Sequence, residues 1–166
     1  MKKQALLLKH WNEALENESW YPPFADALAD ITAEQARWKP EQSSVNSIWE
    51  SVVHLLWYKE RLLQRIKGKP DTRIHSNDET FVVRGSTEDD WQQTVTRLFR
   101  VHRELAQLLK NATAPELDNP PAGPDSDVPL DAQYFTLTVH DAYHTGQIMF
   151  IRKLLKTWPD HRSFAE

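Results

Sequence analysis

With 166 residues the chain can bury one hydrophobic core, so we expect a single domain over residues 1–166. Its formal net charge is −4 at pH 7 and its basic residues form no long run, which argues against nucleic acid as a partner because phosphate binding needs a concentrated positive surface. No apolar run approaches the roughly 20 residues that span a bilayer, and the apolar stretch near the N-terminus is too short for a signal peptide, so we expect no membrane partner and a cytoplasmic location.

The first half of the chain predicts two long helices separated by short helical pieces. Residues 3–18 carry apolar side chains at helical spacing, and after two prolines the sequence "FADALADIT", residues 24–32, continues as a short helix. Thr32 is the expected N-cap of one further helical turn, "AEQARW". The second long helix is predicted from about residue 47 to residue 67, where glycine and proline follow.

The second half predicts two more long helices and two long connections. Residues 69–86 are expected to form a loop, with a possible strand-like turn at "TFVV". Thr87, followed by three acidic residues, predicts the start of a helix that runs to about Asn111. Residues 114–129, "APELDNPPAGPDSDVP", are predicted to be a proline-rich loop without helix, and the last helix is expected over residues 131–158.

Four long amphipathic helices predict an all-α bundle. The sequence lacks the alternation of strands and helices that marks a parallel sheet. It also shows almost no alternation of apolar and polar residues with a period of two, the pattern of a half-buried strand. Connections of about 15 to 20 residues are long for a simple series of helical hairpins. We therefore expect at least one connection that crosses the length of the bundle.

Two histidines in the last predicted helix point to a metal site. In "VHDAYHTGQI", His140 and His144 are four residues apart, so their rings project from one helix face about 6 Å from each other. The chain has no cysteine, so any metal must be held by His, Asp or Glu. A third ligand has to come from another helix, and His54, among apolar residues in the second long helix, is the candidate.

The spacing alone leaves other interpretations open. The three histidines could be unrelated, with one of them a hydrogen-bonded core residue. His102 falls on the apolar stripe of the third long helix. A histidine at such a position is more often a core residue than a residue that lines a pocket. Gly146 lowers helix stability by ~1 kcal/mol relative to alanine, and we expect it to allow a neighbouring helix to approach beside the ligands.

Several residues around the three histidines could contact a substrate. Aromatic residues flank His54, and Gln147 follows His144 in the last helix, although aromatics in a bundle are more often core and Gln147 could be an ordinary polar residue. Glu50 could hydrogen-bond to one of the metal-binding histidines, or it could be a solvated surface residue. The candidates for substrate binding are Trp49, Tyr58, His102 and Gln147.

These residues resemble a known family. The sequence "SIWESVVHLLWYKERLL", followed by "HDAYHTGQI" and preceded by "LADITAEQARWKP", is similar to the DinB/YfiT-like superfamily. The resemblance implies a four-helix bundle with up-down-down-up topology, a homodimer, and one divalent metal ion on His54, His140 and His144. Thr145 stands where many members have a basic residue, so a substrate contact from that residue is not expected here.

A divalent ion on three imidazoles can acidify a bound water or ionise an incoming thiol. The resemblance implies an enzyme that transfers a low-molecular-weight thiol to an electrophile or hydrolyses a small substrate. The alternatives are a stress-induced, dimeric metal-binding bundle without turnover, and an inert bundle with incidental histidines. Zinc, nickel, iron and manganese all accept imidazole, so the sequence leaves the metal open.

Overall fold

The computed structural model describes residues 2–71, 74–121 and 126–159, and these residues contain helices and no strand. The prediction of an all-α protein is confirmed. No helix among the described residues is long and apolar enough to cross a membrane. In chain order, the elements are α1 (Lys3–Leu15), α2 (Phe24–Leu28), α3 (Ala33–Arg37), α4 (Ile48–Ile66), the 3-10 helix η1 (Asn77–Phe81), α5 (Glu88–Asn111), α6 (Ala114–Asp118) and α7 (Leu130–Leu154).

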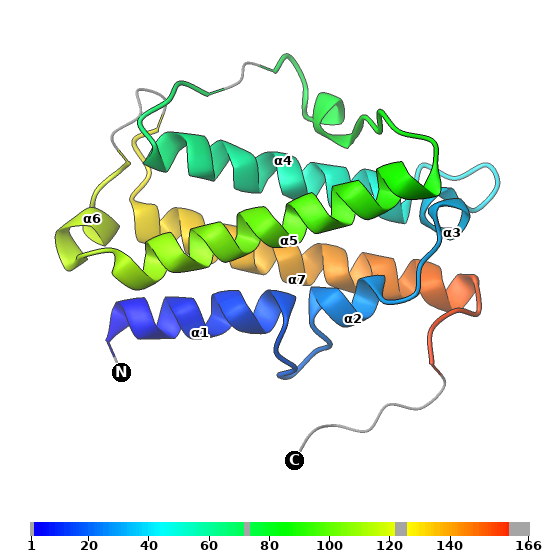
Figure 1. The fold of residues 1–166 in the computed structure, drawn as a ribbon, viewed down its shortest axis with the longest axis horizontal. Helices are drawn as coiled ribbons and strands as arrows, with labels where there is room; N and C mark the ends of the chain where they lie inside the picture. Colours follow the sequence, from blue (N-terminus) through cyan, green and yellow to red (C-terminus); the bar gives the residue numbers. More distant parts are fainter. Residues whose placement is uncertain (1, 72–73, 122–125, 160–166) are drawn as a thin grey trace.

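The four long helices α1, α4, α5 and α7 lie side by side (Figure 1). Helix α4 packs against α5 and α7, and α1 packs against the same two helices from the other side. The colours of Figure 1 show that α1 and α7 run in one direction and α4 and α5 in the other. Because α4 and α5 share a direction, the chain between them returns along the bundle, and on this way it carries η1, which packs on α4.

Reciprocal side-chain to backbone hydrogen bonds define where four of the helices begin. In each case the N-cap hydroxyl accepts from the backbone N–H three residues on, and the side chain of that residue accepts from the N-cap N–H. The N-caps that the sequence predicts at Thr32 and Thr87 are confirmed. The four pairs are Thr32 with Gln35, Ser47 with Glu50, Thr87 with Asp90, and Thr113 with Glu116.

The structure corrects two local predictions. The stretch "APELD" is helix α6 and not loop, because Pro115 lies in the first turn, where no backbone N–H is needed, and Thr113 caps that turn. The strand-like turn at "TFVV" is also wrong, since Thr80 and Phe81 end the 3-10 helix η1. The outer helices are shorter than predicted, with α1 ending at Leu15 and α7 at Leu154.

The core between the long helices is built on large aromatic side chains that also carry hydrogen bonds. Trp11, Trp49, Trp91 and Tyr134 are fully buried. A buried indole N–H or phenol O–H needs an acceptor, and backbone carbonyls supply it. Trp11 Nε1 donates to His102 O, Trp91 Nε1 donates to Ile31 O, and Tyr134 Oη donates to Leu105 O.

One ion pair is fully buried between α4 and α7. Lys59 Nζ donates to Asp141 Oδ2 at 2.6 Å, and both side chains are at most 3% exposed. The ammonium also lies 4.5 Å from the ring centre of Trp11. Burial lowers the pKa of Lys59 and raises that of Asp141, and the contact between the two opposes both shifts. Each charge therefore depends on the other for its solvation inside the bundle.

Replacing one partner of this pair should strongly destabilise the folded protein. We expect Asp141→Ala to lower the free energy of unfolding by about 3–5 kcal/mol, because it leaves the Lys59 ammonium buried without a counter-charge. Urea denaturation of metal-free protein measures the change. Lys59→Met/Asp141→Leu should recover much of the loss, and Glu16→Ala, which removes the exposed ion pair with Arg103, should change little. Equal small effects of Asp141→Ala and Glu16→Ala would contradict this reading of the pair.

Candidate metal centre

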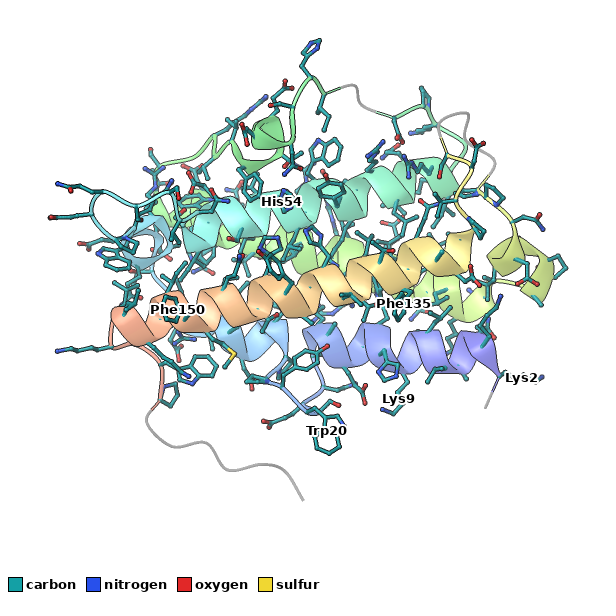
Figure 2. The ribbon with its side chains drawn as sticks, turned by 180° about the vertical axis from the view of Figure 1, so that it is seen from behind. Lys2, Lys9, Trp20, His54, Phe135 and Phe150 are labelled. Atoms are coloured by element: carbon teal, nitrogen blue, oxygen red, sulfur yellow. The ribbon has the colours of Figure 1, made fainter. Side chains whose placement is uncertain are left out.

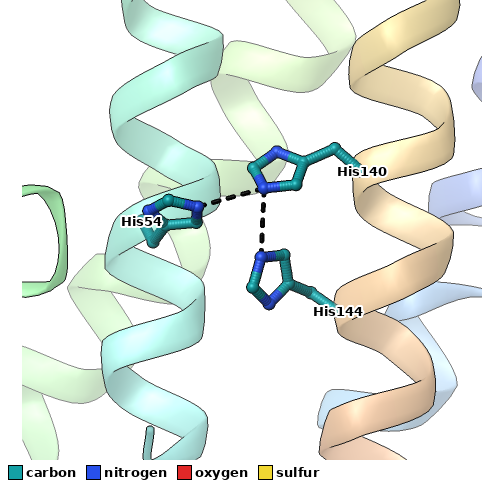
Figure 3. Close-up of side chains that lie close together, drawn as sticks. All are labelled: His54, His140 and His144. Atoms are coloured by element: carbon teal, nitrogen blue, oxygen red, sulfur yellow. Dashed lines mark hydrogen bonds between the residues drawn. The ribbon is translucent and has the colours of Figure 1, made fainter. Parts of the chain in front are cut away.

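Three histidine rings from two helices meet at one point between α4 and α7 (Figure 3). His140 Nε2 lies 3.0 Å from His54 Nε2 and 3.0 Å from His144 Nε2. The potential ligand atoms of all three rings lie within 4.8 Å of one another. Imidazole nitrogens 2.0–2.1 Å from a tetrahedral ion would be about 3.3 Å apart, so the nitrogen set fits one divalent cation.

A chain of hydrogen bonds fixes the proton of His54. Thr80 Oγ1 donates to the carbonyl oxygen of Asn77 at 2.6 Å and lies 2.6 Å from His54 Nδ1. Because the hydroxyl proton is committed to the carbonyl, the Thr80 oxygen accepts from His54 Nδ1–H. The neutral ring then has its free lone pair on Nε2, the atom that faces His140 and His144.

All three rings are neutral well below pH 7. Burial lowers the pKa of His54 to about 3, with the imidazoles of His140 and His144 adding to the effect. Burial also lowers the pKa of His140 and of His144 to about 4, with the neighbouring His144 adding to the shift of His140 and Gln147 opposing that of His144. Neutral imidazole is the form that binds a metal, so protons do not compete for these nitrogens at physiological pH.

Comparison with known proteins gives the family. Residues 22–148 match the sequence profile of the DinB superfamily. The chain belongs to the DinB superfamily. No curated protein and no solved structure gives a significant match to the chain. The matched region contains His54, His140 and His144, so the three converging rings lie within the part of the chain that defines its membership of the DinB superfamily.

In this DinB-superfamily chain, aromatic rings surround the three histidines. The ring of Phe81, at the end of η1, stacks on His54 with centres 3.8 Å apart. Tyr58 contacts His54 edge-on at 5.0 Å, and its hydroxyl donates to Asn77 Oδ1 in η1. Tyr143 contacts His144 edge-on at 5.1 Å. The chain between α4 and α5 thus forms one wall of the site through η1.

The structure separates the four residues that the sequence predicts for substrate contact. Tyr58 lies against His54 and His140. Gln147 is exposed on α7 and lines a cavity of about 550 Å³. Trp49 is buried against Trp91 and also lines a groove of about 1100 Å³ between α4, α5 and the segment around η1.

His102 lies in the core, as the commoner interpretation of its position predicts. Its ring stacks on Trp11 with centres 4.3 Å apart, and its Nε2 lies 3.0 Å from the carbonyl oxygen of Trp11. Burial lowers its pKa well below the usual range. His102 Nδ1 is 3.9 Å from Asp141 Oδ2, so this histidine borders the buried ion pair.

The structure corrects the expectation for Gly146 and decides between the two alternatives for Glu50. An added Cβ at Gly146 would meet no atom within 4 Å, so this glycine does not admit a neighbouring helix of the same chain. Glu50 does not support a ligand, because its carboxylate caps α4 at Ser47 and contacts Lys39. Helix geometry itself separates Gly146 from the histidines, because two residues beyond His144 correspond to about 200° around the helix.

Sequence reasoning missed the residues that orient the site. Thr80 and Phe81 come from a connection without periodicity, so no pattern places them beside His54. Lys59 and Asp141 carry a weak signal, since each is a charged residue at a position where its helix faces the core. The sequence alone gives no indication that these two charges pair across 82 residues.

The stability of the metal-free protein should fall as the pH falls from about 6.5 to about 4. In this range the unfolded chain protonates His54, His140 and His144 at their ordinary pKa, whereas the folded chain keeps them neutral, so protons favour the unfolded state. Thermal unfolding in chelator at a series of pH values measures the effect. His140→Gln should flatten the dependence, and an unchanged slope in that variant would contradict the assignment.

Removing the Thr80 hydroxyl should release the His54 tautomer. We expect Thr80→Val to move a share of the His54 proton from Nδ1 to Nε2, because the acceptor for Nδ1–H is lost. The ¹⁵N chemical shifts of the His54 ring in metal-free protein report the change, and metal affinity should fall about 10- to 100-fold. Thr80→Ser keeps the hydroxyl and should behave as the wild type; a wild-type tautomer in Thr80→Val would disprove the role of Thr80.

Proposed function

We propose that this chain is a metal-dependent enzyme in which His54, His140 and His144 hold one divalent ion. We propose that it transfers a low-molecular-weight thiol to a small electrophilic substrate. The alternative reaction at the same site is hydrolysis of a small substrate. The observation that supports the proposal most directly is the convergence of three neutral imidazole nitrogens on one point. Zinc, nickel, iron and manganese all suit such a nitrogen set, and the proposal does not choose among them.

The side chains at this site have different roles. The three imidazoles would hold the ion as its protein ligands. Thr80 keeps a proton on His54 Nδ1, so that Nε2 is free to bind. Phe81, Tyr58 and Tyr143 surround the rings and limit the access of water. A divalent ion held here supplies Lewis-acid chemistry, which lowers the pKa of a water or thiol that reaches it.

Two features favour thiol transfer over hydrolysis. The cluster contains three histidines and no carboxylate, so it offers no acidic residue as a general base. A thiol has a pKa of about 8.5 and needs only a modest shift to ionise near neutral pH, whereas water starts from about 15.7. The chain has no cysteine, so the thiol has to be a cosubstrate.

The candidates for substrate contact differ in what supports them. Tyr58 is the best supported, because its ring touches two of the three histidines. Trp49 and Thr80 both line the groove of about 1100 Å³, so an electrophile bound in that groove would lie close to the partner of His54. Gln147 remains a prediction. His102 is better explained as a core residue.

The finer predictions about architecture also belong to this proposal. The opposite directions of the helix pairs α1/α7 and α4/α5 support an up-down-down-up four-helix bundle, with α2, α3 and α6 as short additions. A single domain over the whole chain, a cytoplasmic location and a homodimer remain predictions.

Metal analysis tests the ligands. We expect about one divalent ion per chain in protein purified without a histidine tag, and much less in His140→Ala, because two imidazoles do not make a tight site. His10→Ala is the matched control, since His10 is an exposed histidine on α1 that contacts Glu13. Equal metal content in wild type and His140→Ala would remove the proposed site.

An activity assay then distinguishes a metal-dependent enzyme from a metal-binding bundle without turnover. Wild type, His140→Ala and His10→Ala are assayed with several low-molecular-weight thiols and a chromogenic electrophile. The proposal expects activity that chelator and His140→Ala abolish, that His10→Ala retains and that added metal restores after chelation. A stoichiometric ion without any thiol transfer or hydrolysis would favour the non-enzymatic, metal-binding bundle instead.

A further inference from the structure

The cavity of about 550 Å³ lies between α7 and the connection that leads into α4. In Figure 2, α4 and α7 lie side by side on the near side of the bundle, with His54 labelled on α4 and Phe150 towards the end of α7. The volume is within the roughly 300–1,000 Å³ that small-molecule sites usually have. The residues that line the cavity are Ser44, Val45, Asn46, Tyr143, Gly146, Gln147, Phe150 and Ile151.

Two residues of this lining connect the cavity to His144. The ring of Tyr143 contacts the ring of His144 edge-on, with centres 5.1 Å apart. A hydrogen bond from the side chain of Gln147 opposes the lowering of the His144 pKa, so this side chain lies beside the ring. Gln147 is three residues beyond His144, which is about 4.5 Å along the helix axis and 60° around it. The cavity therefore begins within one helical turn of a candidate metal ligand.

The lining of the cavity carries no charge. None of the described residues that line it is Asp, Glu, Lys, Arg or His. A charged group that entered would lose its hydration and find no counter-charge. The polar groups of the lining are neutral, namely the amides of Asn46 and Gln147 and the hydroxyl of Ser44. The cavity thus suits an uncharged molecule that carries a neutral polar substituent.

Gly146 leaves open space between two aromatic residues of the lining. An added Cβ at Gly146 would meet no atom within 4 Å, and its φ is not positive, so neither packing nor backbone conformation requires glycine there. Tyr143 and Phe150 lie on the same face of α7 as Gly146, about 10.5 Å from each other along the helix axis. Between them a flat ring can approach the helix backbone, at a place that a larger side chain would fill.

We propose that this cavity holds the electrophilic substrate, and that this substrate is a flat, uncharged aromatic molecule. The proposal rests on the proposed thiol transfer and names the class of its second substrate. Tyr143 and Phe150 contact the aromatic ring of the substrate, and the neutral polar groups of the lining bind its substituent. The reacting carbon then lies at the end of the cavity that borders His144.

The groove of about 1100 Å³ is the competing location for the electrophile. It reaches the site at Thr80, which bonds to His54 Nδ1. The nitrogen of His54 that faces His140 is Nε2, so the His54 ring separates the groove from the point where the three rings converge. The groove also has charged residues in its lining, among them Glu60, Arg84 and Arg97. These features favour the smaller, uncharged cavity for an uncharged substrate.

Binding to the metal-free chain tests the cavity without any turnover. The probe is 1,3-dinitrobenzene, which is flat and uncharged and has no leaving group. In a ¹H–¹⁵N NMR titration it should shift the amide signals of Gly146 and Gln147, whose residues line the cavity. The charged analogue 3,5-dinitrobenzoate should bind at least 10-fold more weakly, because the cavity offers no counter-charge.

Gly146→Leu is the decisive variant. Its side chain enters open space, and leucine favours a helix over glycine, so the fold should be kept while the dissociation constant for 1,3-dinitrobenzene rises at least 10-fold. Gln107→Leu, at an exposed position of α5, is the matched control and should bind the probe as the wild type does. Thr96→Trp obstructs the groove and should also leave binding unchanged. Circular dichroism and sedimentation check that all variants keep the wild-type helix content and oligomeric state.

Kinetics with a reactive electrophile extend the test to catalysis. With 1-chloro-2,4-dinitrobenzene, the thiolate sulfur forms a bond to the ring carbon, chloride leaves with the electron pair of the carbon–chlorine bond, and the thiol proton passes to the buffer. Gly146→Leu should raise the KM for this electrophile at least 10-fold, with little change in kcat. The metal content and the KM for the thiol should stay at their wild-type values.

Three results would overturn the proposal. The first is a wild type without saturable binding of 1,3-dinitrobenzene, including one whose cavity is filled by another protein surface. The second is a Gly146→Leu variant that binds the probe as the wild type does. The third is weaker binding in Thr96→Trp, which would place the site in the groove. The proposed function fails separately: a chain that binds the probe in the cavity but has no metal-dependent turnover would be a binding protein for uncharged aromatic molecules.

Discussion

The buried ion pair between Lys59 and Asp141 constrains the rest of the structure. It joins α4 to α7 in the interior of the bundle, where neither charge can be solvated by water. Moving α7 along α4 by one helical turn would separate the two groups and leave both charges uncompensated. Because Asp141 directly follows His140, and Lys59 is five residues beyond His54, the register that satisfies the pair also sets His54 opposite His140. The Lys59–Asp141 ion pair therefore fixes the register of α7 on α4 that brings the histidines together.

The second contribution to the site comes from outside the bundle. The returning chain between α4 and α5 places η1 against α4, and there Thr80 fixes the proton of His54 while Phe81 covers its ring. Tyr58 contacts the same segment through Asn77. Helix packing therefore determines where the three histidines lie, and the connection determines how His54 is protonated. A change in this connection would alter the site without altering the bundle.

These two contributions explain how far the sequence could predict the molecule. Helical periodicity predicts the long helices, and the spacing of His140 and His144 predicts a shared face, because both depend on local geometry. The partner of His54 in η1 and the pairing of Lys59 with Asp141 depend on which distant segments meet, and no local pattern contains this information. Helix α6 is a different case: the proline-rich sequence predicts a loop, but Pro115 lies in the first turn of the helix, where proline is accepted.

Helix α7 shows that residues close in the sequence need not share a face of the helix. Gly146 is two residues beyond His144, which is about 200° around the helix, so the two residues belong to different faces. In the structure, α7 directs His140, Asp141 and His144 inward and carries Gly146 on its exposed side. The period of a single helix therefore carries this information, whereas the contacts of Lys59 with Asp141 and of Thr80 with His54 depend on which distant segments meet.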